Sequence, residues 1–155
     1  MLSATHLHAM IVHFPIALLL AGFLSEVISL FNKREFFRQG SFFLLLLGTL
    51  GAAAAFLSGN IAGDGMDEGA LGQAMELHEQ AALITLLISM VALAFRISAP
   101  YLKWKETRKR TLGVALYTLA IAAVSLTGYR GGELVFSHAA GVELAIPDFS
   151  QVEPD

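Results

Sequence analysis

The sequence predicts an all-α fold: an up-and-down four-helix transmembrane bundle with the N- and C-termini on the same, outer side. Hydrophobic residues make up 55% of the chain, charged residues make up 15%, and the mean hydropathy is +0.64. Four apolar segments are each close to the roughly 20 residues that a helix needs to cross the ~30 Å core of a bilayer. At 155 residues the chain suits one integral membrane domain, 1–155.

The first crossing is predicted over about 9–31, and Pro15 near its start allows two interpretations. Either the helix begins close to Phe14, with the proline in its first turn, where the missing N–H costs little. Or it begins near Thr5, and the proline kinks it and frees a carbonyl near Ile11. No Lys or Arg precedes this segment, so we expect a retained helix rather than a cleaved secretory signal.

The other three crossings are predicted over about 41–63, 80–98 and 111–130. Small residues at i, i+4 spacing fill the second half of the second crossing, and such faces let neighbouring helices approach closely in lipid. The fourth crossing is expected to stop at the glycine pair that opens 131–155, which we interpret as an interfacial segment and a polar tail.

The distribution of positive charge predicts the orientation. Only Arg130 falls on the side of the chain termini, and short basic loops stay in the cytoplasm. We therefore expect a multi-pass protein of the inner (cytoplasmic) membrane, in contact with the lipid bilayer, with both termini periplasmic. The residues on the opposite side are Lys33, Arg34, Arg38, Arg96, Lys103, Lys105, Arg108, Lys109 and Arg110.

All five histidines fall at the outer face in this topology. His6, His8 and His13 enter the first crossing, His78 precedes the third, and His138 follows the fourth. One interpretation is that polar interfacial zones tolerate histidine. The other is a metal or haem site in the outer half of the bundle.

The first and third helices of an up-and-down bundle are diagonal neighbours that point the same way. His13 and His78 can therefore stand at similar depth and hold a haem b non-covalently as axial ligands. His8 and His138 could supply a second pair, because His8 and His13 are about 140° apart around a helix and do not share a face. The absence of cysteine excludes disulfides, thiolate ligands and covalent c-type haem attachment.

Copper is the main metal alternative to haem. His6, His8, Met10 and His13 combine imidazole with thioether, a ligand mixture that suits copper.

Two charged residues each allow a structural and a functional interpretation. Arg130 either pairs with Glu133 or binds a haem propionate by a charge-assisted bond. Glu26, inside the first crossing, either pairs with Lys33 or Arg96 or handles protons near the cytoplasmic side.

The loop between the second and third crossings is acidic. It is either a solvated face or a surface that attracts a basic partner such as a soluble cytochrome. No catalytic motif or basic nucleic-acid surface is recognisable, so no nucleic-acid partner is expected. The acids are Asp64, Asp67, Glu68, Glu76 and Glu79.

Three segments resemble a known family. HAMIVHFPIALLL, LHEQAALITLL and GGELVFSHAAGV are similar to the bacterial membrane family called domain of unknown function 2231, whose members typically carry HPxxVHFPIAL, a histidine opening the third helix, and GGxLVYxHGxGV. The resemblance covers nearly the whole chain. The sequence departs from the family pattern at Ala9, where the family often has Pro, and at Ala139, where it often has Gly. The family positions are His8, His13, His78, Gly131, Gly132, Glu133, Leu134, Val135 and His138.

This resemblance implies a four-helix membrane domain, and relatives joined to Rieske iron–sulfur or cytochrome c-like modules imply electron transfer. We therefore expect a haem b-binding protein that exchanges electrons with a quinol, a cytochrome or an iron–sulfur protein, as an electron-transfer subunit of an oxidoreductase. Two alternatives stay open: a membrane protein that binds copper or another divalent metal, and a cofactor-free structural subunit of a membrane complex.

Overall fold

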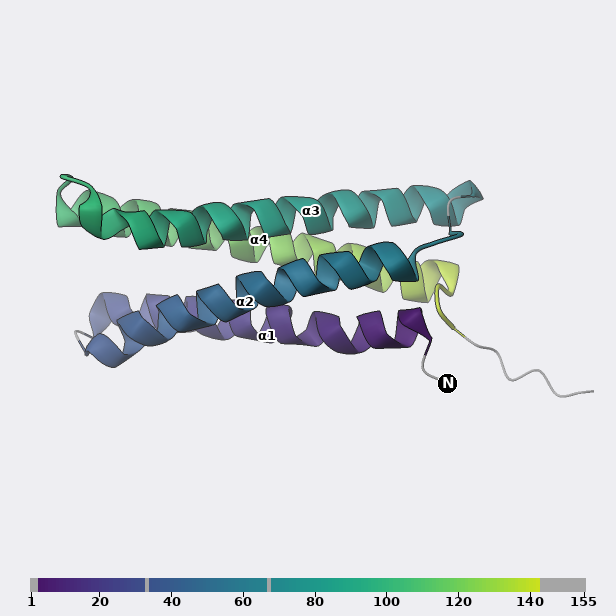
Figure 1. The fold of residues 1–155 in the computed structure, drawn as a ribbon, viewed down its shortest axis with the longest axis horizontal. Coiled ribbons are helices and arrows are strands. Elements are labelled where there is room, and N and C mark those ends of the chain that lie inside the picture. Colours follow the sequence, from purple (N-terminus) through teal and green to yellow (C-terminus); the bar gives the residue numbers. More distant parts are fainter. Residues whose placement is uncertain (1–2, 33, 67, 143–155) are drawn as a thin grey trace, which may run out of the picture.

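The computed structural model describes residues 3–32, 34–66 and 68–142, which form four long helices (Figure 1). Successive helices run in opposite directions, so α1 begins and α4 ends at the same end of the bundle. The predicted all-α, up-and-down architecture is confirmed. The helices are α1 (Ala4–Phe31), α2 (Glu35–Ala62), α3 (Gly69–Ser98) and α4 (Glu106–His138), and a 3₁₀ turn, η1 (Ala99–Tyr101), follows α3.

The start of α1 decides between the two interpretations of Pro15. The backbone N–H of His6 donates to Ser3 Oγ at 3.2 Å, which caps the helix at its first turn. Pro15 then lies inside the helix, so the interpretation with an early start is correct. Its pyrrolidine ring is buried against α2, where a Cβ added to Gly51 would lie 3.3 Å from it.

Two other helix ends differ from the sequence expectation. α3 begins at Gly69, so His78 lies in its third turn rather than before its start. α4 continues through Gly131 and Gly132 to His138, so the expected stop at this glycine pair is wrong. The polar tail predicted over 146–155 lies outside the described residues, as do Lys33 and Asp67.

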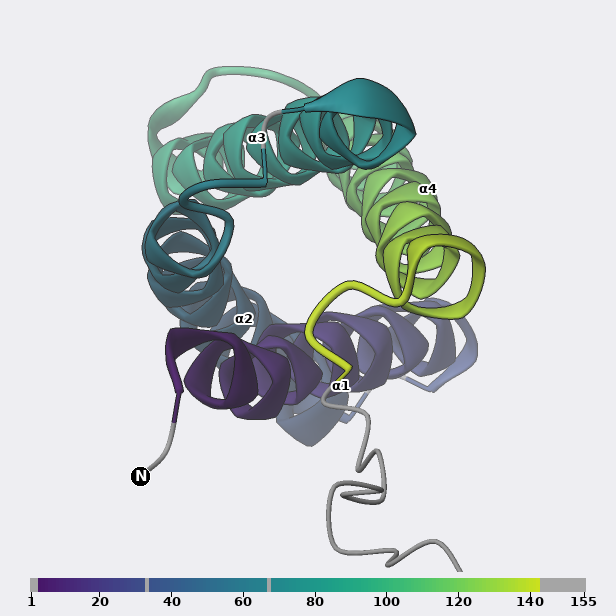
Figure 2. The ribbon, with the colours of Figure 1, turned by 90° about the vertical axis from the view of Figure 1, so that its right-hand side faces the viewer.

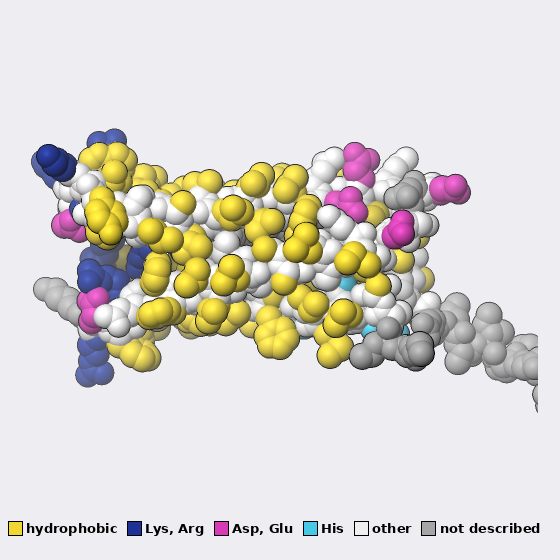
Figure 3. Space-filling view, in the orientation of Figure 1, with side chains coloured by type: hydrophobic (Ala, Val, Ile, Leu, Met, Phe, Trp, Pro, Cys, Tyr) yellow, Lys and Arg dark blue, Asp and Glu magenta, His cyan; other side chains and the backbone are white. Residues whose placement is uncertain are grey.

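The bundle has an apolar outside and a partly polar inside. All four helices are long and apolar enough to cross a membrane, and large side chains such as Phe14, Leu57 and Phe136 are exposed along them (Figure 3). This arrangement inverts that of a soluble bundle and suits lipid as the solvent. The buried polar side chains are Ser25, Glu26, Ser41, Thr49, Thr85 and Ser89.

The helices pair most closely as α1 with α2 and α3 with α4, and Figure 2 shows the two hairpins from the histidine end. At Gly48 of α2 the backbone approaches Leu19 so closely that an added Cβ would lie 2.9 Å from the leucine side chain. Leu19 and Tyr117 lie in the central core cluster, which joins both hairpins. Gly48 therefore lets α2 approach α1 closely, in the way that small residues do when helices pack in lipid.

Candidate functional site

His8 faces the interior of the bundle and packs against α2. Its Nδ1 lies 2.9 Å from Ser58 Oγ, and its ring covers Gly59, where an added Cβ would be 3.0 Å from His8 Cε1. The Ser58 hydroxyl donates to the Ala55 carbonyl at 3.0 Å, so its oxygen is left to accept from His8 Nδ1–H. In the neutral ring, Nε2 of His8 therefore keeps its lone pair free.

His78 takes a similar position on α3 and packs against α4. It is half-buried, and a Cβ added to Gly131 would lie 3.2 Å from its Cε1. Its Nδ1 is buried without a protein partner at hydrogen-bonding geometry, although the backbone of Thr127 lies beside it. This ring nitrogen is buried and has no protein partner, so it can still form a hydrogen bond.

His8 and His78 lie at a similar depth because of two equal spacings in the sequence. Eighteen residues separate His8 from Glu26 on α1, and eighteen separate His78 from Arg96 on α3, which is five full helical turns in each case. α1 and α3 run in the same direction, and Arg96 Nη1 bonds Glu26 Oε1 at 2.9 Å near one end. Equal rise along the two helices therefore places both imidazoles at a similar depth near the other end.

The Glu26–Arg96 pair is fixed by further bonds. Glu26 is 3% exposed and its second oxygen accepts from Ser41 Oγ at 2.7 Å. Arg96 also donates from Nη2 to the Arg38 carbonyl at 3.3 Å. Both carboxylate oxygens of Glu26 are thus satisfied, and the predicted ion pair with Arg96 is present.

His13 lies apart from this pair. It is exposed, and its Nδ1 donates to the Ala9 carbonyl of the preceding turn at 2.6 Å. His6 is also exposed and bonds Ser3 Oγ through Nδ1 at 2.8 Å, and Met10 is 58% exposed.

The expected copper ligands are divided between two faces of α1. His6, Met10 and His13 follow each other at i, i+4 and i+7 on the outer face, whereas His8 turns inward. Within residues 3–32, 34–66 and 68–142, no three His, Asp or Glu side chains gather closely enough to hold a metal ion.

The last two predicted site residues lie near the end of α4. Arg130 Nη1 bonds Glu133 Oε2 at 2.8 Å, so the pairing interpretation is present in the structure, and its guanidinium lies 5.9 Å from the Tyr129 ring centroid. His138 is half-buried in the final turn. Both residues belong to the same end of the bundle as His8.

Residues 4–144 match the model of the family described as "Predicted membrane protein (DUF2231)". The chain belongs to this family. No curated protein and no solved structure matches it. In this DUF2231 protein, the segments that carry the resemblance supply His8, His78 and Gly131, which lie in the two ring contacts described above.

Sequence reasoning did not single out Ser58 or Thr127 of this DUF2231 protein as neighbours of the two imidazoles. Both are ordinary helix residues whose hydroxyls bond the preceding turn, at 3.0 Å and 3.1 Å. The signal that could have identified the histidine pair is the repeated eighteen-residue spacing from each histidine to a charged residue.

Proposed function

We propose that this membrane protein binds haem b between His8 and His78 and transfers electrons. The observation that carries the proposal is that two half-buried imidazoles stand at similar depth on helices that lie diagonally across the bundle (Figure 2). The pair differs from the expected His13 and His78, because His13 is exposed and lies on the other face of α1.

The ligand set favours haem over a bare metal ion. Two imidazoles supply both axial ligands of a haem iron, and the porphyrin supplies the rest, whereas zinc and copper sites usually take three or four protein ligands. In the described part of the chain, no His, Asp or Glu side chain joins His8 and His78 in a set of three. Haem, when bound, provides one-electron exchange.

The neighbouring residues would orient the two ligands. Ser58 accepts from His8 Nδ1–H, which fixes the tautomer and leaves Nε2 as the nitrogen that would bind the iron. The missing side chains of Gly59 and Gly131 leave room for the two rings against α2 and α4. Arg130, at the same end, would pair with a propionate in place of Glu133.

The positive-inside rule supports a location of this site in the outer half of a bacterial inner membrane. Lys and Arg gather at the opposite end of the bundle (Figure 3), and basic ends stay in the cytoplasm. Acidic side chains near the start of α3, such as Glu76 and Glu79, then face outward and would attract a basic redox partner.

Absorption spectroscopy of the purified protein tests the proposal. After expression with ample haem supply, the dithionite-reduced protein should show the Soret and α bands of a b-type cytochrome. His8→Ala and His78→Ala should each lose most of the bound haem, because each removes one axial ligand. His13→Ala is the matched control and should keep the wild-type spectrum.

Other outcomes separate the alternatives. Wild-type protein without haem under these conditions would contradict the proposal. Stoichiometric copper without iron in metal analysis would instead favour a site at His6, Met10 and His13 on the outer face of α1. Loss of haem in His13→Ala but not in His8→Ala would restore the pairing expected from the sequence.

A further inference from the structure

The end of the bundle opposite the histidines contains a cleft of about 960 Å³ that residues of all four helices line. Figure 3 shows that Lys and Arg side chains gather at this end. Phe95, which lines the cleft, packs against Trp104 with 6.4 Å between ring centroids. Trp104 and Tyr101 are exposed aromatics of the kind that lie at the headgroup level of a membrane.

The charges of the cleft do not balance. Its lining holds five cations and three carboxylates, which leaves two positive charges in excess. The cations are Arg34, Arg38, Arg96, Lys109 and Arg110, and the carboxylates are Glu26, Glu35 and Glu106. Each carboxylate already has a cation of its own: Glu26 pairs with Arg96, Glu35 with Arg38, and Glu106 with Lys109. Arg34 and Arg110 have no carboxylate partner within the described residues.

Two cations on α4 are held at the cleft with unused donors. The Lys109 side chain is only 12% exposed, and its amine uses one of three N–H groups on Glu106 at 2.8 Å. Arg110 donates from Nη2 to the Ser29 carbonyl at 2.7 Å, which ties its guanidinium to the end of α1 and leaves its other N–H groups free. A largely buried amine and a tethered guanidinium, both with unused donors, favour a multivalent anion.

We propose that this cleft binds a phosphate group, carried either by the headgroup of an anionic phospholipid or by a soluble phosphate compound. Basic pockets between transmembrane helices on the cytoplasmic side are suited to anionic headgroups, and Arg and Lys are the usual phosphate ligands. Arg110 and Lys109 supply the donors, and Arg96 adds a guanidinium whose position Glu26 fixes. The site lies at the opposite end from the histidine pair and does not depend on haem.

Thermal unfolding of the delipidated, detergent-solubilised full chain tests the proposal with three probes. Phosphatidylglycerol, phosphatidylcholine and inorganic phosphate are titrated separately, the last against chloride at equal ionic strength. We expect a saturable rise in Tm with phosphatidylglycerol or with inorganic phosphate, and none with phosphatidylcholine. The probe that acts identifies whether the source is a lipid or a soluble compound.

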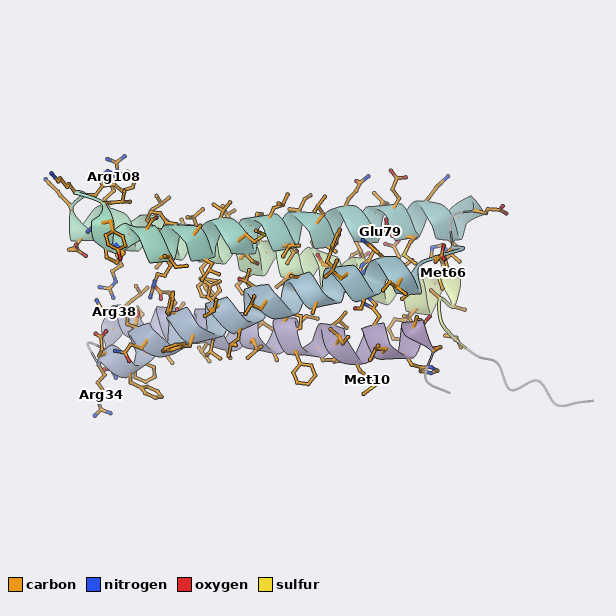
Figure 4. All side chains as sticks on the ribbon, in the orientation of Figure 1. Met10, Arg34, Arg38, Met66, Glu79 and Arg108 are labelled. Carbon is orange, nitrogen blue, oxygen red and sulfur yellow. The ribbon has the colours of Figure 1, made fainter. Side chains whose placement is uncertain are left out.

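Arg108→Gln provides the matched control. Arg108 belongs to the same basic stretch but lies outside the cleft, with its guanidinium 4.5 Å from the Trp104 ring centroid and directed away from the bundle (Figure 4). Arg110→Gln and Lys109→Gln should each weaken the apparent affinity about five- to tenfold, and Arg108→Gln by less than about twofold.

The remaining outcomes decide against the site. Equal losses in all three variants would mean that only the general charge of this end attracts anions. No saturable response to either phosphate probe in the wild-type protein would also overturn the proposal. If Arg110→Gln fails to fold because the Ser29 contact is lost, Lys109→Gln alone decides, since its partner Glu106 is 88% exposed.

Discussion

Ala139 ends α4 in a left-handed backbone conformation, with φ 53° and ψ 29°. This conformation lets the N–H groups of Ala139 and Ala140 bond the carbonyls of Val135 and Leu134, at 3.1 Å and 3.0 Å. An L-residue pays roughly 1–2 kcal/mol for this region, whereas glycine adopts it freely. The chain departs here from the glycine that its family often carries.

Replacing Ala139 with glycine should therefore stabilise the protein. We expect about 1 kcal/mol in favour of Ala139→Gly, because the relieved strain exceeds the added flexibility of the unfolded chain. Thermal unfolding of the purified protein in detergent measures the change. Ala140→Gly is the control, since Ala140 has no positive φ and should gain nothing. An unchanged or lower Tm for Ala139→Gly would show that the turn carries no strain.

Glu26 illustrates how far single residues can be predicted. A carboxylate inside an apolar segment needs a partner, which the sequence could narrow to Lys33 or Arg96. The structure selects Arg96 and adds Ser41, a residue that gave no signal because serine is common on small-residue helix faces. Which residues pair with Glu26 depends on the rotation of each helix about its axis, and hydropathy does not indicate that rotation.

Helix rotation also explains why the sequence favoured His13 over His8. Similar depth was expected of His13 and His78, whereas the equal spacings from Glu26 and Arg96 place His8 level with His78. Glu26 provides the missing reference, because a buried charge marks the inner face of α1 and His8 lies five full turns before it. His13 is thirteen residues from Glu26, so it lies about 140° around the helix from that face.

The helix ends were less predictable than the helices. Hydropathy identified all four crossings, but α3 begins at Gly69 rather than near Gln80. The intervening residues mix polar and apolar side chains, and they form helical hydrogen bonds before the continuous apolar segment begins. Hydropathy indicates which part of a helix contacts lipid. The backbone hydrogen bonds of the helix continue past that part until a residue interrupts them.

The contact between α1 and α4 at Gly22 gives an element-level prediction. A Cβ at Gly22 would overlap the Tyr117 hydroxyl and lie 2.9 Å from Leu44 Cβ, so three helices meet there without spare room. Gly22→Ala should destabilise the fold by about 1–3 kcal/mol. Gly128→Ala is the control, because nothing lies within 4 Å of its added Cβ and alanine is the better helix former.

Unfolding of these two glycine variants by titration with a denaturing detergent measures the difference. The expected order of midpoints places Gly22→Ala below the wild-type protein and Gly128→Ala at or above it. If both variants match the wild type, α1 and α4 must be able to separate at Gly22 without loss, and the tight packing around Tyr117 would not determine the fold.

At the scale of the whole molecule, one ion pair near the basic end of the bundle also affects how the residues at the histidine end are arranged. Glu26 and Arg96 join the α1–α2 hairpin to the α3–α4 hairpin and so fix how the two hairpins are rotated. With equal spacing along two helices that run in the same direction, that rotation also sets His8 and His78 at a similar depth. The buried pair thus influences the arrangement of the proposed histidine site about 27 Å away.

The orientation of the bundle is the last prediction, and the absence of cysteine makes it directly measurable. Gln73→Cys places a thiol on an exposed position near the start of α3, and Lys103→Cys places one on the exposed linker before α4. Because basic loops stay in the cytoplasm, a membrane-impermeant maleimide should label Gln73→Cys in intact spheroplasts and Lys103→Cys only after lysis. Eight other cations remain at the basic end, so the second variant should keep its orientation.

The reverse labelling pattern would exchange the two proposed sites. The histidine pair would then face the cytoplasm, where an external electron acceptor could not reach it, and the phosphate-binding cleft would open outward, away from soluble cytoplasmic phosphate compounds. The expected pattern instead places a redox site near the outer surface and an anion site at the inner surface. The two proposals therefore depend on the same physical fact: in the described part of the chain, Lys and Arg other than Arg130 gather at one end of the bundle, and histidine lies at the other.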